Sequence, residues 1–251
     1  MRILLTNDDG IHAPGLALLE RITARLSDDV WVCAPAEEQS GAGHSLTLHS
    51  PVRLREHGQR RFAVTGTPSD SVNLALRKLF ADKQPDVVIS GINAGENLAD
   101  DITYSGTVSA AMEAALAGIP AFALSQAFRE RGASFDAAEH WAEKVLRPLL
   151  DRQMANRTLV NVNFPALPHD SVRGIKVVRQ GFHDYARGSL VEGRDPRGRP
   201  YYWFGLDDIE HTLDHGTDLE AIADGYVAVT PLQLDLTHHA AIGQMGEAFA
   251  S

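Results

Sequence analysis

The sequence contains a single cysteine and fewer basic than acidic residues. Cys33 has no partner for an intrachain disulfide, which fits a reducing compartment, and its apolar neighbours predict a small core residue. The 251 residues include 23 Lys and Arg against 33 Asp and Glu, for a formal net charge of −10. Binding to polymeric nucleic acid or to anionic membranes depends on clustered basic residues. We therefore expect neither as a partner.

Long apolar runs are also missing. No stretch reaches the roughly 18 apolar residues that a membrane-spanning helix needs. At the N-terminus only Ile3-Leu4-Leu5 precedes a polar segment, which is too short an apolar run for a signal peptide. A hydrophobic content of 44% is ordinary for a globular chain with a substantial core. We expect a globular protein located in the cytoplasm.

Several common catalytic patterns do not occur. No G-x-G-x-x-G follows the first predicted strand, and no G-x-x-x-x-G-K-[ST] is present, which argues against the usual dinucleotide-binding and NTP-hydrolysing loops. There is no HExxH or cysteine-rich zinc pattern either. Asp8 and Asp9 are adjacent rather than spaced as D-x-D, which counts against an aspartyl-phosphate phosphatase.

Short apolar runs alternate with helical patterns over the first two-thirds of the chain. This alternation predicts an α/β fold with a doubly wound, mostly parallel sheet and helices on both faces. The expected strands are 2–6, 30–34, 52–55, 61–65, 86–90, 120–125 and 158–163, and the expected helices are about 14–26, 72–80, 107–116 and 135–150.

The composition changes in the last third. Residues 181–216 are rich in Gly, Arg and Pro and include Tyr201-Tyr202-Trp203-Phe204, which favours an extended arm or hairpin that is buried against a partner. A short helix at 218–223 and a strand at 226–230 follow. We predict a single domain over 1–251, with a core at about 1–180 and 217–235. The arm at about 181–216 would serve oligomerisation, and residues 236–251 would form a polar C-terminal tail.

Polar motifs stand where several predicted strands end, and ligands of doubly wound sheets bind outside the carboxyl ends of the strands. Asp8 and Asp9 follow the first strand, and two neighbouring carboxylates suit Mg²⁺ or Mn²⁺. Ser40 lies in a glycine-bearing loop, and Asn93 and Asn97 lie in a second long loop. An Asx turn at Asp8-Asp9 and plain surface loops at the other two places remain open alternatives.

The predicted helix at 107–116 begins at Ser105-Gly106-Thr107. The free N–H groups of a helix start make an anion site, although Ser105 could simply cap the helix. His44 is a further candidate because it follows Ser40 closely in the sequence, but a surface role is the commoner one for such a histidine.

Five segments together resemble the SurE family, the stationary-phase survival proteins. They are MRILLTNDDGIHAPGL, VTGTPSDSV, VVISGINAGEN, YSGTVSAAMEAALAGIPAFALS and the late GYVAVTPLQLDLT, in the family's order. The resemblance implies a Rossmann-like core and a divalent-metal-dependent phosphatase of nucleoside monophosphates. It also implies homodimers or homotetramers built by exchanged C-terminal elements.

The resemblance also assigns roles to individual residues. It implies one Mg²⁺ or Mn²⁺ per subunit, bound at positions matching Asp8, Asp9, Ser40 and Asn93. It implies phosphate contacts at positions matching Asn97, Ser105, Gly106 and Thr107. The sequence departs from the usual pattern at Glu96, Ser109 and Ser71, and Glu96 adds negative charge beside the expected phosphate site.

We therefore expect a 5′-nucleotidase, a metal-dependent phosphatase that hydrolyses nucleoside 5′-monophosphates and also 3′-monophosphates. Asp8 and Asp9 are the expected catalytic residues, with Asp9 orienting or deprotonating the attacking water. Two alternatives remain, an aspartyl-phosphate-type phosphatase and a non-catalytic nucleotide-binding module.

Overall fold

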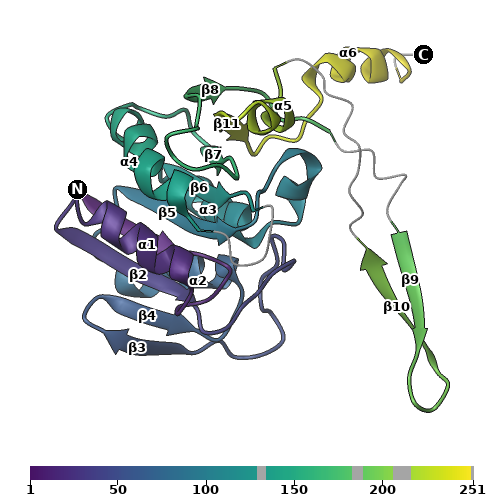
Figure 1. Ribbon diagram of the computed structural model, residues 1–251, viewed down its shortest axis with the longest axis horizontal. Helices are drawn as coiled ribbons and strands as arrows, with labels where there is room; N and C mark the ends of the chain where they lie inside the picture. The colour runs from purple at the N-terminus through teal and green to yellow at the C-terminus, as the bar shows by residue number, and fades with distance from the viewer. Residues whose placement is uncertain (129–133, 183–188, 206–215, 250–251) are drawn as a thin grey trace.

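A computed structural model describes residues 1–128, 134–182, 189–205 and 216–249 of the chain. A nine-stranded sheet with the order β3-β4-β2-β1-β5-β6-β7-β11-β8 runs through the body of the molecule (Figure 1). All its pairings are parallel except β3 with β4 and β7 with β11. The strands are β1 (Arg2–Thr6), β2 (Asp29–Pro35), β3 (Leu54–Gly58), β4 (Arg61–Val64), β5 (Val87–Ala94), β6 (Ala121–Gln126), β7 (Thr158–Phe164), β8 (Ile175–Val177) and β11 (Val227–Gln233).

Helices cover both faces of this sheet, which confirms the predicted α/β class (Figure 1). The helices are α1 (Pro14–Thr23), α2 (Pro68–Leu74), α3 (Gly106–Leu116), α4 (Asp136–Leu150), α5 (Asp218–Ala223) and α6 (His239–Glu247). A π-helical turn, η1 (Ala75–Leu79), continues α2, and a 3₁₀ turn, η2 (Ala99–Thr103), precedes α3.

The apolar side chains of the sheet divide into two cores. Successive side chains of a strand point to opposite faces, and β1 shows the consequence. Ile3 and Leu5 belong to the core under α1 and α4, while Leu4 belongs to the core under α2 and α3. The near-continuous apolar run of β1 is therefore that of a strand buried on both faces.

The strand order places a topological switch point between β1 and β5. The chain moves from β1 to β2 on one side, and it returns through β5, β6 and β7 on the other side. Crossovers that leave in opposite directions open a crevice at the carboxyl ends of the two central strands, where ligands of such sheets bind. The residues that follow β1 and those at the end of β5 flank this crevice.

Several elements differ from the sequence-based expectation. β3 covers 54–58 rather than 52–55, and α2 begins at Pro68 rather than at about 72. β5 continues to Ala94 rather than ending at Ser90, with a register shift against β6 between Ser90 and Asn93. β8 was not predicted, because only three residues pair and two of them are exposed. The expected polar tail contains the helix α6, which buries no residue in the described chain although Ile242 and Met245 lie on one of its faces.

Part of the expected arm forms a β-hairpin. β9 (Ser189–Arg194) pairs antiparallel with β10 (Pro200–Gly205), and the hairpin projects away from the main sheet (Figure 1). Tyr202 and Trp203 are exposed there. The rest of the expected arm, residues 183–188 and 206–215, lies outside the described residues.

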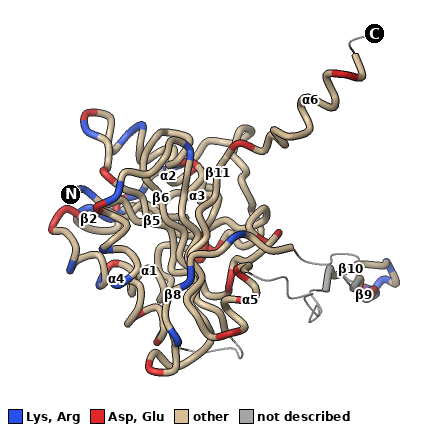
Figure 2. The backbone as a smooth tube through the Cα atoms, turned by 90° about the horizontal axis from the view of Figure 1, so that it is seen from above, with Lys and Arg blue, Asp and Glu red and all other residues tan. Residues whose placement is uncertain are grey.

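Charged residues are spread over several elements. Figure 2 shows Lys and Arg interspersed with Asp and Glu along the described backbone. Among the described residues, no helix is both long enough and apolar enough to cross a membrane.

Gln126 joins β6, β7 and α4 through one buried side chain. Its Nε2 donates to the carbonyls of Phe164 and Pro165, at 3.3 and 2.9 Å, and also to Ala127 O at 3.0 Å. Its Oε1 accepts from the backbone N–H of Ala138, in the first turn of α4, at 2.9 Å. The amide thus satisfies backbone groups that have no water available.

We predict that Gln126→Met lowers the free energy of unfolding by about 2–4 kcal/mol, because buried backbone groups lose their partners. Urea unfolding followed by circular dichroism measures this change. Gln153→Met is the matched control, since Gln153 is exposed and its substitution should change stability by less than about 0.5 kcal/mol. Equal effects of the two substitutions would contradict the role of Gln126.

Candidate active site

Asp8 and Asp9 leave the sheet at the carboxyl end of β1, beside the switch point. Two backbone contacts connect them with the neighbouring segments. Gln39 N donates to Asp8 O at 2.8 Å, and Ala94 N, at the end of β5, donates to Asp9 Oδ2 at 3.3 Å. The first contact brings the loop that contains Ser40 to the end of β1, and the second brings the Asn93 segment there. Segments that are far apart in the sequence thus meet at one place, as predicted.

The first turn of α3 packs directly on Asp8. Thr107 Oγ1 donates to Asp8 Oδ1 at 2.5 Å. A Cβ added at Gly106 would lie 2.7 Å from Asp8 Cβ and 2.9 Å from its Oδ2. Only glycine allows the helix start to approach the carboxylate this closely.

The electrostatics of the two aspartates differ from those of surface carboxylates. The pKa of Asp8 is raised from 3.8 to about 6, chiefly by burial and also by the charge of Asp9, while the hydrogen bond from Thr107 opposes the rise. Burial also raises the pKa of Asp9, against the hydrogen bond from Ala94, and the charge of Glu38 adds to the rise. The site concentrates negative charge where water is scarce, and a bound cation would stabilise it.

Ser40 and Asn93 contribute neutral oxygens to the same region. Ser40 is exposed and its hydroxyl donates to Glu38 Oε1 at 2.8 Å. Asn93 donates through Nδ2 to Gly95 O at 2.9 Å, which leaves Oδ1 as its acceptor. Two carboxylates with one hydroxyl and one amide oxygen are a hard-oxygen donor set, and this set fits Mg²⁺ or Mn²⁺.

Asn97 is held by a buried polar network at the ends of β6 and β7. Its Nδ2 donates to Ser125 Oγ at 2.8 Å, and its backbone N–H donates to Asn163 Oδ1 at 2.8 Å. The Asn97 carbonyl accepts from Nδ2 of Asn161 and Asn163, at 2.8 and 3.1 Å. The network fixes the segment between β5 and η2.

These supporting residues and Glu38 were not predicted from the sequence. A signal was present for Asn161 and Asn163, which alternate with valines in TLVNVNF and therefore point to one face of β7. Amides on one face of a buried strand need hydrogen-bond partners. Glu38 gave no such signal, because its neighbours in the sequence are ordinary loop residues.

Ser105 caps α3. Its Oγ accepts from Val108 N at 3.1 Å, so the capping alternative describes its contact in this structure. The hydroxyl proton remains available for donation, and the helix start carries partial positive charge. Glu96, the departure beside the expected phosphate site, is exposed.

His44 and Cys33 have other surroundings. His44 Nε2 lies 2.8 Å from Glu113 Oε1, and Asn73 Nδ2 donates to Glu113 Oε2 at 2.6 Å. These contacts fasten the Ser40 loop to α2 and α3. Cys33 is fully buried, and burial raises the pKa of its thiol to about 12, so the predicted core role is confirmed and a thiolate nucleophile is excluded at neutral pH.

The raised pKa of Asp8 predicts a pH-dependent cost to the metal-free fold. The folded state binds the Asp8 proton more tightly than the unfolded chain, because its pKa of about 6 exceeds 3.8. Ionisation of Asp8 therefore lowers the stability of the folded state. This cost is absent below the unfolded-state pKa, grows as the pH rises to the folded-state pKa, and is on the order of 3 kcal/mol above it. We expect Asp8→Asn to stabilise the EDTA-treated protein at pH 7.5, with a smaller gain at pH 5.

Urea unfolding of the two proteins across this pH range measures the difference. Asp28→Asn, an exposed aspartate just before β2, is the control and should show no such gain. A gain for Asp8→Asn that is the same at pH 5 and 7.5 would contradict the assigned pKa.

Comparisons with known proteins identify the family. The family model described as "Survival protein SurE" matches residues 3–187. A 5′-nucleotidase SurE of Erythrobacter litoralis is 66% identical over 99% of this chain and 100% of its own length. The corresponding protein of Rhizorhabdus wittichii is 58% identical over 96% of this chain and 97% of its own length. The crystal structure of the SurE protein from Aquifex aeolicus superposes with a TM-score of 0.87 at 39% identity, covering 99% of both chains. The chain belongs to the SurE family.

Proposed function

We propose that this protein is a divalent-metal-dependent phosphatase that hydrolyses nucleoside 5′-monophosphates, and also 3′-monophosphates, to nucleoside and phosphate. The observation that carries the proposal is the buried Asp8 carboxylate, which lies next to Asp9 and against the N-terminus of α3. The full-length relatives named 5′-nucleotidase SurE support the substrate class.

The proposed metal ligands are Asp8, Asp9, Ser40 and Asn93, with one Mg²⁺ or Mn²⁺ per subunit. A metal ion bound there would polarise a phosphoryl oxygen and lower the pKa of a water. The carboxylates of Asp8 and Asp9 must be ionised to bind it. Thr107 orients Asp8 for this purpose through its hydrogen bond to Oδ1.

The proposed phosphate contacts lie at the start of α3 and on Asn97. The N–H groups of Gly106 and Thr107 and the hydroxyl of Ser105 would donate to phosphoryl oxygens as negative charge develops on them. Asn97 would donate from the segment that β6 and β7 hold in place. Asp9, which is less buried than Asp8, would orient or deprotonate the attacking water.

Asp8→Asn tests the site. We expect the variant to lose at least about 100-fold in phosphate release from AMP with Mn²⁺, because an amide binds the metal poorly and holds no negative charge. EDTA should abolish release by the wild-type protein, and Mn²⁺ should restore it. Asp28→Asn, with its exposed side chain, should keep full activity.

The activity assays can contradict the proposed function in four ways. Wild-type turnover by Asp8→Asn would refute the site assignment, and turnover in EDTA would refute metal dependence. A phosphoenzyme trapped at Asp8 would favour the aspartyl-phosphate alternative. No release of phosphate from AMP or p-nitrophenyl phosphate with any divalent metal would leave a nucleotide-binding module.

We also propose a homodimer or homotetramer in the cytoplasm, with the arm at the subunit contact. The β9–β10 hairpin exposes large apolar side chains, with Leu190, Val191, Tyr202 and Trp203 each more than half exposed. Exposed apolar clusters of this kind mark interaction surfaces.

We expect light scattering at micromolar concentration to give at least twice the mass of one chain. Trp203→Glu should shift the population towards the monomer, because a charge would be buried at the contact. Leu116→Glu, which changes an exposed residue at the end of α3, is the control and should leave the mass unchanged. A monomeric wild-type protein would refute the proposal.

A further inference from the structure

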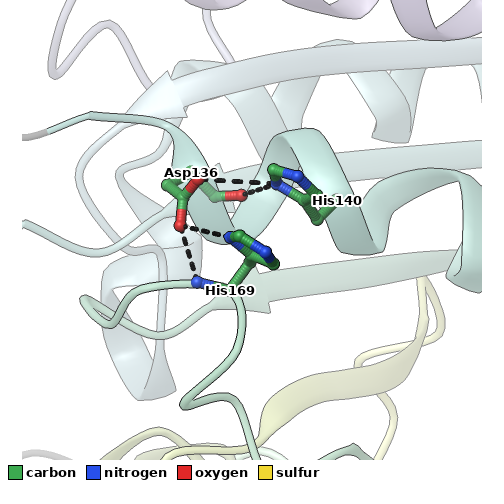
Figure 3. Close-up of side chains that lie close together, drawn as sticks. All are labelled: Asp136, His140 and His169. Atoms are coloured by element: carbon green, nitrogen blue, oxygen red, sulfur yellow. Dashed lines mark hydrogen bonds and ion pairs between the residues drawn. The ribbon is translucent and has the colours of Figure 1, made fainter.

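Three metal-binding side chains cluster at the start of α4, outside the candidate active site. Asp136 and His140 come from the first turns of α4, and His169 comes from the loop after β7 (Figure 3). One ligand atom from each residue lies within 4.8 Å of the other two. His169 Nδ1 is 2.9 Å from Asp136 Oδ2, and His140 Nδ1 is 3.5 Å from Asp136 Oδ1.

The backbone holds these residues in place. Asp136 and His140 are four positions apart, so they share one face of the helix. His169 is fixed on both sides, because its N–H donates to Asp136 Oδ2 at 2.6 Å and its carbonyl accepts from Trp141 Nε1 at 3.0 Å. Gln126 holds the same first turn of α4 through Ala138 N. The cluster is therefore built from two anchored segments rather than from long side chains that meet by chance.

The spacing suits a tetrahedral metal ion. Ligand atoms bonded to Zn²⁺ at about 2.0–2.1 Å in tetrahedral geometry are roughly 3.3 Å apart. The observed separations are 2.9 Å from His169 Nδ1 to Asp136 Oδ2 and 3.5 Å from His140 Nδ1 to Asp136 Oδ1, so they reach different oxygens of the carboxylate. His140 Nδ1 also lies 3.0 Å from the Asp136 carbonyl oxygen, so binding a metal ion through one atom of each residue requires the side chains to adjust.

The two imidazoles need only a small rearrangement to bind a metal ion. Their rings are stacked, with centroids 3.6 Å apart and planes 9° from parallel. A ring nitrogen binds a metal ion in the plane of its ring, so at least one ring must turn. The side chains of His140 and His169 are 45% and 43% exposed, which leaves room for this turn and for entry of the ion.

We propose that Asp136, His140 and His169 form a second metal site, which takes a borderline divalent ion of the Zn²⁺ type. Each residue supplies one ligand atom, and water fills the fourth position. Two imidazole nitrogens and one carboxylate favour such an ion over Mg²⁺, which prefers oxygen ligands. The site shares no residue with the hard-oxygen set at Asp8. A bound ion would tie the start of α4 to the loop after β7.

Titration calorimetry of the full-length protein with Zn²⁺, in excess Mg²⁺, tests the proposal. We expect the wild-type protein to bind one equivalent of Zn²⁺. The double variant His140→Ala/His169→Ala should not bind this equivalent, or should bind it at least about tenfold more weakly. Asp8→Asn should keep this equivalent, which separates the second site from the proposed catalytic one. His239→Ala is the matched control, because His239 also pairs with a carboxylate, Asp235, at 2.8 Å but lies outside the cluster.

A second readout avoids dependence on activity. Zn²⁺ should raise the melting temperature of the wild-type protein and of His239→Ala, but not that of the double variant, since an ion that binds only the folded state stabilises it. Circular dichroism without metal checks that each variant is folded. Asp136→Asn is a second ligand variant, and its amide oxygen can still accept from the backbone N–H of His169. Equal Zn²⁺ binding by the wild type and the ligand variants would overturn the proposal. The absence of Zn²⁺ binding by the wild type would also overturn it and leave a hydrogen-bonded cluster.

Discussion

The close approach between Asp8 and the first turn of α3 is the contact on which the arrangement of the site depends. It needs Gly106, because any larger residue would collide with Asp8, and it needs Thr107 to donate to the buried carboxylate. A helix N-terminus favours a nearby anion, and in this structure that anion is Asp8 itself. The same helix start therefore serves the proposed metal ligand and, in the proposed function, the phosphate.

The fold brings about this approach through its crossovers. β1 and β5 are neighbours at the switch point, so the segment after β1 and the end of β5 share one crevice. α3 follows β5 and packs against the core that contains Leu4, which directs its N-terminus to the carboxyl end of the sheet. The Ser40 loop joins them because His44 and Gln39 fasten it to α3 and to β1. The site thus follows from sheet order and from a few specific contacts.

The sequence was sufficient for the class of fold and for the sheet edge that carries the polar motifs. Alternation of apolar runs and amphipathic segments predicted the parallel sheet, and Asp8, Asn93 and Thr107 were expected at strand ends or helix starts. The partners of Asn97 could not be predicted, since contact between residues 97 and 163 depends on strand order rather than on local pattern. α6 was missed because it is short and its only large apolar residues are Ile242 and Met245, which give a weak periodic signal.

The chain presents two donor sets with different chemistry near the carboxyl ends of its strands. The Asp8 set offers oxygen atoms, and its charge is buried, so it favours a hard cation that screens two carboxylates. The Asp136 set offers two imidazoles and a carboxylate at the surface. By affinity alone Zn²⁺ competes with Mn²⁺ for a given site, because binding generally strengthens along the first transition series. Imidazole ligands outside the active site would give such an ion a preferred place, and the oxygen set would then remain available to the more abundant hard cation.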